Sequence, residues 1–230
     1  MGDSSGGDGP QEGREDGPHQ NQPLVTDGTP LEDAEAALVL THGRGASARG
    51  MVQLANEVHE EGVAVLAPQA ARQTWYPNSF LAPVEQNEPG RSSGLQAIAA
   101  AIDEATDAGI PHERIMLIGF SQGACLASEF VARNPRRYGG LAALSGGLIG
   151  EKIDPEEYAS DDADLEETPV FLGCSDVDPH IPERRVYETA DVLEAMNADV
   201  TKRLYEGMGH GINDDELATV SEMVAALVAE

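Results

Sequence analysis

The chain has 230 residues, a length that suits one α/β domain better than two. Hydrophobic residues make up 40% of it, enough for a globular core, but 41 Asp and Glu stand against 14 Lys and Arg, a formal net charge of -27. So negative a protein is not expected to bind nucleic acid or to insert into or dock on an anionic membrane, because like charges repel.

The basic residues are almost all arginines, since Lys152 and Lys202 are the only lysines. An acidic excess with so little lysine is typical of proteins from salt-loving organisms. In molar salt the Debye length falls to ~3 Å, and repulsion between surface carboxylates is screened. We therefore predict a halophilic protein, with an ordinary acidic mesophilic protein as the alternative.

Residues 1–30 are rich in Gly, Asp, Pro and Gln and poor in aliphatic side chains. Such a composition buries too little apolar surface to offset the entropy lost on ordering. We predict a disordered acidic tail over residues 1–30, with extended packing from Leu24 onward as the alternative, and one folded domain over residues 31–230. No apolar run of signal-peptide type and no stretch of ~20 apolar residues is present, so we expect a soluble cytoplasmic protein.

From there the sequence alternates short apolar runs with helical patterns, which is typical of βαβ units and a mainly parallel sheet. The predicted strands lie at residues 37–41, 63–66, 115–118, 141–144 and 170–172, with a weaker one at 200–205. The predicted helices lie near residues 51–61, 92–108, 124–133, 182–196 and 214–229. Because the strand runs lack polar alternation, helices should cover both faces of the sheet.

The cysteines and the spacing of possible metal ligands indicate which cross-links and cofactors to expect. Cys125 and Cys174 fall in a predicted apolar helix and strand, so we expect buried free thiols rather than a disulfide. No His, Asp, Glu and Cys cluster has the spacing of metal ligands, and we expect neither a metal nor another cofactor.

A Gly-x-Ser-x-Gly pattern occupies residues 119–123, with Ser121 at its centre. The pattern alone is weak, but here it follows a predicted strand and precedes a predicted helix, which is the context of a nucleophile elbow. The two glycines leave room for a strained serine backbone and for the crossing helix, whose N-terminus favours an anion beside Ser121. We therefore predict that Ser121 is the nucleophile of a serine hydrolase, with an incidental serine on a glycine-rich turn as the alternative.

Three of the six histidines can be compared as the base that activates this serine. His210 lies in a glycine-flanked loop before the last helix, from which its ring can reach the carboxyl edge of the sheet. His42 directly follows the first strand and is expected to build an oxyanion loop. His180 lies beside an acidic cluster as a pocket or surface residue. We therefore predict His210 as the base.

The acid and the oxyanion donors follow from the same order of elements. The strand at residues 170–172 leads to Asp176 and Asp178, and either can orient the histidine. Asp178 is preferred because the proline after it favours an extended backbone. The N–H of Gln122, just after the nucleophile, should be one oxyanion donor, and the N–H of Arg44 in the loop after the first strand the other. A simple glycine-rich turn is the alternative for that loop.

Taken together, these motifs resemble the phospholipase/carboxylesterase family of α/β-hydrolases, which includes the acyl-protein thioesterases. The resemblance runs from about Ala36 to the C-terminus. It rests on the segments at residues 42–45 (His-Gly-Arg-Gly), 119–123, 144–146 (Leu-Ser-Gly), 176–182 and 209–210.

The resemblance implies an α/β-hydrolase fold without a large cap domain, and a triad of Ser121, Asp178 and His210 with oxyanion donors at Arg44 and Gln122. Two departures stand out: Cys174 and Ser175 replace a frequent His-Gly, and Arg44 replaces a usually apolar residue, which places a positive side chain at the pocket mouth.

The segment at residues 74–80 corresponds to the substrate-binding loops of the family. It predicts that Trp75 and Tyr76 line the acyl or alcohol pocket, with plain packing as the alternative.

The predicted function is hydrolysis of carboxylic esters, lysophospholipids and thioesters included, through an acyl-enzyme. The expected partner is a small ester substrate, and a homodimer is left open. An acyl-protein thioesterase or a serine peptidase on the same fold is the nearest alternative, and a non-catalytic binding protein of hydrolase fold is the more distant one.

Overall fold

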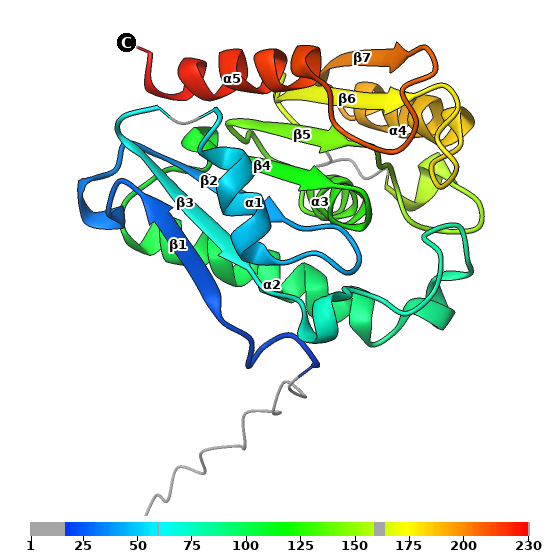
Figure 1. The fold of residues 1–230 in the computed structure, drawn as a ribbon, viewed down its shortest axis with the longest axis horizontal. Coiled ribbons are helices and arrows are strands. Elements are labelled where there is room, and N and C mark those ends of the chain that lie inside the picture. Colours follow the sequence, from blue (N-terminus) through cyan, green and yellow to red (C-terminus); the bar gives the residue numbers. More distant parts are fainter. Residues whose placement is uncertain (1–16, 59, 159–163, 230) are drawn as a thin grey trace, which may run out of the picture.

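A computed structural model describes residues 17–58, 60–158 and 164–229, which form one seven-stranded sheet with helices on both faces (Figure 1). The strands are β1 (Leu24–Gly28), β2 (Ala36–Thr41), β3 (Val63–Pro68), β4 (Ile115–Phe120), β5 (Gly140–Leu144), β6 (Pro169–Ser175) and β7 (Asp199–Tyr205). Their order is β1-β3-β2-β4-β5-β6-β7, with β1 antiparallel and all other pairs parallel.

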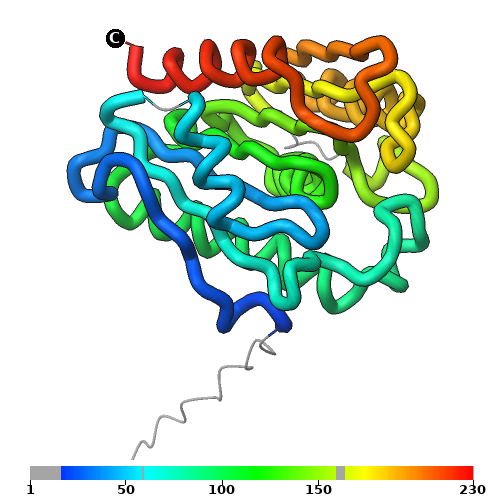
Figure 2. The backbone as a smooth tube through the Cα atoms, in the orientation of Figure 1, coloured from blue at the N-terminus to red at the C-terminus, as the bar shows by residue number. Residues whose placement is uncertain are grey.

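Helices cover both faces of the sheet, as the ribbon and the tube show (Figure 2). A pair packs on one face and a group of three on the other. The first pair is α1 (Ala48–Ala55) and α5 (Asp214–Val228), and the second group is α2 (Gly90–Asp107), α3 (Gln122–Arg133) and α4 (Glu183–Ala195). Short 3-10 helices lie at η1 (Leu31–Asp33), η2 (Ala71–Gln73), η3 (Val84–Asn87), η4 (His112–Arg114) and η5 (Pro155–Glu157).

The central strands are apolar because both of their faces are buried. In β2, Ala37 and Val39 join the core under α2 and α3, while Leu38 and Leu40 join the core under α1 and α5. Every residue of β2 is buried, so no polar position alternates with the apolar ones. The predicted mainly parallel sheet, covered on both faces, is confirmed.

The edge strand β7 is the one that the sequence predicted weakly. Its residues are exposed or half-buried, and Lys202 and Arg203 lie on it. Charged side chains on an edge strand block pairing with another sheet, so this strand lacks the apolar run of the central ones.

The prediction of a disordered tail over residues 1–30 is wrong for residues 17–30. Strand β1 pairs with β3 from Leu24 to Gly28, and His19 is buried and bonded to Trp75 and Ala71. Long-range pairing to a neighbouring strand orders this segment despite its polar composition. Residues 1–16 lie outside the described residues.

The strand order reverses between β2 and β4, because β3 lies on one side of β2 and β4 on the other. At such a switch point the loops after two neighbouring parallel strands part and leave a crevice outside the carboxyl ends of the strands. Thr41 of β2 lies opposite Gly119 of β4, so this crevice opens between His42 and Ser121.

Candidate active site

Ser121 lies on a strained turn between β4 and α3. Its backbone has φ 55° and ψ -119°, which is unusual for a residue with a side chain. A side chain at Gly119 would overlap the backbone of Ala124, and one at Gly123 would overlap the backbone of Thr41. The two glycines therefore allow α3 to cross close to β2 and β4, and the turn presents the Ser121 hydroxyl at the crevice.

The imidazole of His210 lies against this hydroxyl. Its Nε2 is 2.9 Å from the Ser121 Oγ, and its Nδ1 is 2.7 Å from the Asp178 Oδ2. Because a carboxylate only accepts hydrogen bonds, Nδ1–H donates to Asp178 and Nε2 is left to accept the serine hydroxyl proton. The loop that carries His210 needs left-handed backbone at Gly207 (φ 67°) and Gly209 (φ 77°), which glycine adopts without strain.

The carboxylate of Asp178 is fully buried behind His210 and fully hydrogen bonded. Burial acts to raise its pKa, but the hydrogen bonds from His210 and from the backbone N–H groups of His180 and Ile181 outweigh burial and hold the pKa below its usual value. Asp178 is therefore a carboxylate at neutral pH, suited to orienting an imidazole and to balancing an imidazolium.

The other candidate acid, Asp176, has a different position. Its Oδ1 accepts from the N–H of Gly207 at 2.8 Å, and it forms no hydrogen bond with His210. Two serines hold the same loop: Ser175 Oγ accepts from Gly209 N–H at 3.0 Å, and Ser145 Oγ donates to the Gly211 carbonyl at 3.3 Å. Both lie in segments that the sequence marked, 144–146 as a family motif and 174–175 as a departure from one, but the sequence predicted no role for either side chain.

Arg44, in the loop after β2, and Gln122, at the start of α3, both line the cavity beside Ser121. Neither backbone N–H donates a hydrogen bond to another described residue. Gln122 is the first residue of α3, so its N–H also lies at the positive end of a 12-residue helix. These two donors are available to an oxyanion.

The side chains of the same two residues build a wall of the site. Gln122 Nε2 donates to the Tyr76 carbonyl at 2.8 Å, and its Oε1 accepts from the Trp75 N–H at 2.9 Å. The Arg44 guanidinium donates to the carbonyls of Tyr76, Pro77 and Asn78 at 2.9, 2.9 and 2.6 Å. The side chain of each residue is thus hydrogen bonded to the segment at residues 75–78. A shift of that segment would therefore also move the backbone N–H of Arg44 or Gln122.

Of the two aromatic residues predicted to line the pocket, one does so and the other does not. Tyr76 lines the cavity. The prediction for Trp75 is wrong, because its side chain has no exposed surface and its Nε1–H donates to the His42 carbonyl at 2.8 Å. Trp75 packs under the loop after β2, predicted to hold an oxyanion donor, and supports it.

The two remaining histidines also have distinct environments. His42 is fully buried, its Nδ1–H donates to the Gly43 carbonyl, and its Nε2 accepts from the Ala70 N–H. Burial lowers its pKa, so the ring is neutral and holds the oxyanion loop in place. His180 is exposed at the mouth of the site, with its ring edge-on to that of His210 at 4.9 Å between centroids.

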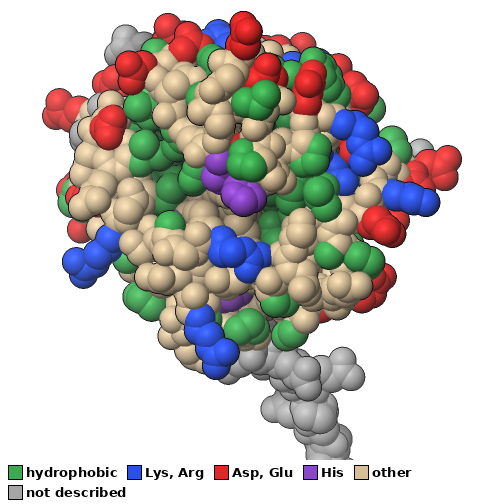
Figure 3. Space-filling model, turned by 45° about the vertical axis from the view of Figure 1, so that its right-hand side comes forward, with side chains coloured by type: hydrophobic (Ala, Val, Ile, Leu, Met, Phe, Trp, Pro, Cys, Tyr) green, Lys and Arg blue, Asp and Glu red, His purple; other side chains and the backbone are tan. Residues whose placement is uncertain are grey.

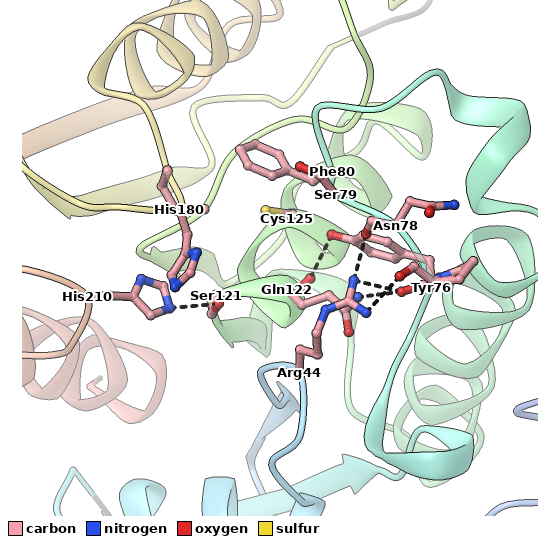
Figure 4. A pocket seen from close by; sticks show the side chains of 12 residues that line it. Arg44, Tyr76, Asn78, Ser79, Phe80, Ser121, Gln122, Cys125, His180 and His210 are labelled. Carbon is pink, nitrogen blue, oxygen red and sulfur yellow. Dashed lines mark hydrogen bonds between the residues drawn. The ribbon is translucent and has the colours of Figure 1, made fainter.

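A cavity of about 430 Å³ adjoins Ser121, and the labelled side chains converge on it (Figure 4). It is lined by Arg44, Tyr76, Pro77, Asn78, Ser79, Phe80, Ser121, Gln122, Cys125, His180, Ile181 and His210. Burial raises the pKa of the Cys125 thiol to about 12. The sulfur is therefore a neutral thiol at physiological pH and a poor competitor of Ser121 as nucleophile.

Within the described part of the chain, no group of three or more His, Cys, Asp and Glu side chains is arranged to hold a metal ion. No helix there has the length and apolarity needed to cross a membrane.

Comparison with solved structures finds close similarity over nearly the whole domain. A crystal structure titled phospholipase/carboxylesterase from Dyadobacter fermentans is 40% identical, covers 89% of this chain and 97% of its own, and has a TM-score of 0.85. Zea mays acyl-protein thioesterase 2 has a TM-score of 0.69 over 90% of this chain and 100% of its own, but at 17% identity it supports the fold alone. The chain thus has the expected α/β-hydrolase fold.

Sequence comparison points to the same group of proteins. An acyl-protein thioesterase 1 from Kluyveromyces lactis is 33% identical over 59% of this chain and 60% of its own length, so less than two thirds of that relative is matched. The family model described as Phospholipase/Carboxylesterase matches residues 28–228. The chain therefore belongs to the phospholipase/carboxylesterase family.

Proposed function

We propose that the protein is a serine hydrolase of carboxylic esters in which Ser121, His210 and Asp178 form the catalytic triad. The observation that carries the proposal is the continuous hydrogen-bonded chain from Ser121 Oγ through His210 to Asp178, next to two N–H groups without an acceptor among the described residues. Membership of the phospholipase/carboxylesterase family supports it.

In the first step His210 Nε2 takes the Ser121 proton while Oγ attacks the ester carbonyl carbon. The carbonyl oxygen becomes an oxyanion, which the N–H groups of Arg44 and Gln122 stabilise. Removing one such donor typically raises the barrier by ~2.7–4 kcal/mol. His210 then gives its proton to the leaving alkoxide, the carbon–oxygen bond breaks, and an acyl-enzyme remains.

In the second step water replaces the alcohol. His210 Nε2 takes a proton from water, the hydroxide attacks the acyl carbon, and the bond to Ser121 Oγ breaks as the proton returns to the serine. Asp178 holds the ring in one tautomer and balances its charge in both steps.

A thioester substrate is the second candidate, because curated relatives are named acyl-protein thioesterases. The same groups serve a thioester, in which the leaving thiolate needs less help from the general acid. Comparing kcat/KM for an ester and a thioester of the same acyl group shows which of the two substrate classes the protein prefers.

The test of the proposal is Ser121→Ala assayed on p-nitrophenyl acetate and butyrate. Removing the nucleophile should lower kcat by ~10⁴-fold or more, and a fluorophosphonate probe should label the parent but not the variant. Ser92→Ala is the matched control, since Ser92 is exposed on α2 away from the cavity. A Ser121→Ala variant as active as the parent would refute the proposal.

A further inference from the structure

The cavity beside Ser121 differs in charge from the rest of the molecule. No Asp or Glu is among its lining residues, although the chain has 41 of them. In the space-filling view histidine side chains lie in the hollow and a basic side chain beside it, while acidic side chains gather around the periphery (Figure 3). The pocket lining thus holds an arginine and no carboxylate, on a strongly negative protein.

Asp178 and Glu129 are buried carboxylates that have partners other than Arg44. Asp178 accepts hydrogen bonds from His210 Nδ1–H and from the N–H groups of His180 and Ile181. Glu129 has no exposed side-chain surface and forms ion pairs with Arg91 and Arg133. Neither carboxylate lines the cavity.

Arg44 supplies a positive charge in a fixed position. Among the described residues it forms no ion pair with a carboxylate; its partners are the backbone carbonyls of Tyr76, Pro77 and Asn78. A guanidinium has five N–H donors, so these three hydrogen bonds hold the group rigid and leave two N–H free. A rigid cation with free donors loses little conformational entropy when it binds an anion.

The direction of proton transfer indicates that Arg44 lies beside the acyl group of the substrate rather than beside its alcohol. His210 must reach the leaving oxygen, so the alcohol lies on the side of His210 and His180. The acyl group then extends from Ser121 the other way, toward Tyr76, Phe80 and Arg44, which lie across the cavity from the histidines (Figure 4).

Away from the histidines, the cavity lining is apolar near Ser121 and carries Arg44. Phe80 and Cys125 line the cavity there and offer apolar contact to methylene groups. We propose that the acyl group preferred by this site is a short methylene chain that ends in a carboxylate bound by the Arg44 guanidinium. The substrate class is the monoester of a dicarboxylic acid, and the inference rests on the ester hydrolysis proposed above.

The chemical step is unchanged by this specificity. Ser121 Oγ bonds to the ester carbonyl carbon, the alkoxide leaves with a proton from His210, and water releases the free dicarboxylate. The second carboxylate takes no part in bond making; it only binds.

The test compares matched substrates. Monoethyl succinate, glutarate and adipate are each paired with the neutral ethyl ester of the corresponding monoamide, and kcat/KM is measured by ethanol release at one KCl concentration. We expect kcat/KM of the acid to exceed that of its amide by ~10-fold or more for at least one chain length, as for a hydrogen bond to a charged group.

Three variants identify the residue responsible. Arg44→Gln removes the charge and should bring the acid-to-amide ratio close to one, while Arg44→Lys keeps the charge and should retain part of the preference. Arg49→Gln is the control, because Arg49 is exposed on α1 and its loss changes the net charge equally. The ratio cancels any damage to the oxyanion loop, which slows both substrates alike.

Two results would overturn the inference: a ratio of one or below in the parent for all three chain lengths, or a preference that survives in Arg44→Gln. If neither substrate of any pair is hydrolysed and no probe labels Ser121, the proposed ester hydrolysis itself has failed.

Discussion

The two sides of Ser121 are held by different kinds of contact. On the side of the base, the short side chains of Ser145, Ser175 and Asp176 bind the backbone of the glycine-rich loop that carries His210. On the oxyanion side, the long side chains of Arg44 and Gln122 reach across to the backbone of residues 75–78. The residues that present the free N–H groups thus also anchor the pocket wall, whereas the base has a separate set of supports.

The largest expected effect separates the two aspartates on the base side. Asp178→Asn should lower kcat/KM by ~10⁴-fold, because the wrong tautomer of His210 then faces Ser121. Asp176→Asn should cost far less, since the Asp176 side chain has the Gly207 N–H as its one hydrogen-bond partner among the described residues. Both are measured on p-nitrophenyl butyrate, and a larger loss in Asp176→Asn would reverse the assignment of the acid.

The next effect concerns the oxyanion side. Gln122→Ala keeps the N–H but leaves the Trp75 N–H without its acceptor, while the Tyr76 carbonyl keeps only its hydrogen bond from Arg44. We expect the free energy of unfolding in urea to fall by about 3 kcal/mol and kcat/KM to fall by ~10-fold or more.

Gln53→Ala is the control, since Gln53 is exposed on α1. If Gln122→Ala matches the parent in both stability and rate, the wall and the oxyanion hole are not coupled as described.

A smaller effect concerns Glu216, which lies in the first turn of α5, just after the His210 loop. Its side chain is fully buried, Oε2 accepts from the Asn213 N–H at 2.9 Å, and Oε1 has no partner among the described residues. Burial raises its pKa from 4.5 to about 7. Between these values the folded protein keeps a proton that the unfolded chain releases, so this group's contribution to stability is lost as pH rises from 4.5 through 7.

Glu216→Gln removes the buried charge and keeps an oxygen for the Asn213 N–H. We expect the variant to be more stable than the parent at pH 8 by about 2 kcal/mol, and equal to it near pH 4.5, in urea unfolding. A variant less stable than the parent at pH 8 would show that the carboxylate is favourable where it lies.

The smallest effect concerns the acidic surface that both sides share. If the protein is halophilic, the melting temperature should rise by several degrees from low to molar KCl as salt screens the carboxylates. The acid-to-amide ratio at Arg44 should fall over the same range, because the same salt screens that pair. No gain in melting temperature would argue for an ordinary acidic mesophilic protein.

Features set by neighbours in the sequence could be predicted well. The central strands are buried on both faces, so their apolar runs are visible without any partner, and the elbow around Ser121 is one continuous segment. The order of Ser121, Asp178 and His210 along the chain was likewise visible, because each directly follows a strand or lies in a glycine-rich loop.

Features that depend on residues far apart in the sequence could not be predicted. Strand β1 is too polar to be predicted as a strand from its own residues. It is ordered by pairing with β3 some 40 residues later, where Leu24 lies opposite Pro68. Trp75 and Tyr76 are neighbours of similar chemistry, yet one packs under the oxyanion loop and the other lines the cavity.

By itself, the sequence determined the class of fold, the elbow and the chemical types needed around Ser121. Only the tertiary structure decided that Asp178 rather than Asp176 contacts His210, and that Arg44 lies beside the cavity with its guanidinium fixed on three carbonyls. The physical reason is that local propensity depends on adjacent residues, whereas a hydrogen bond between loops depends on where several strands end in space.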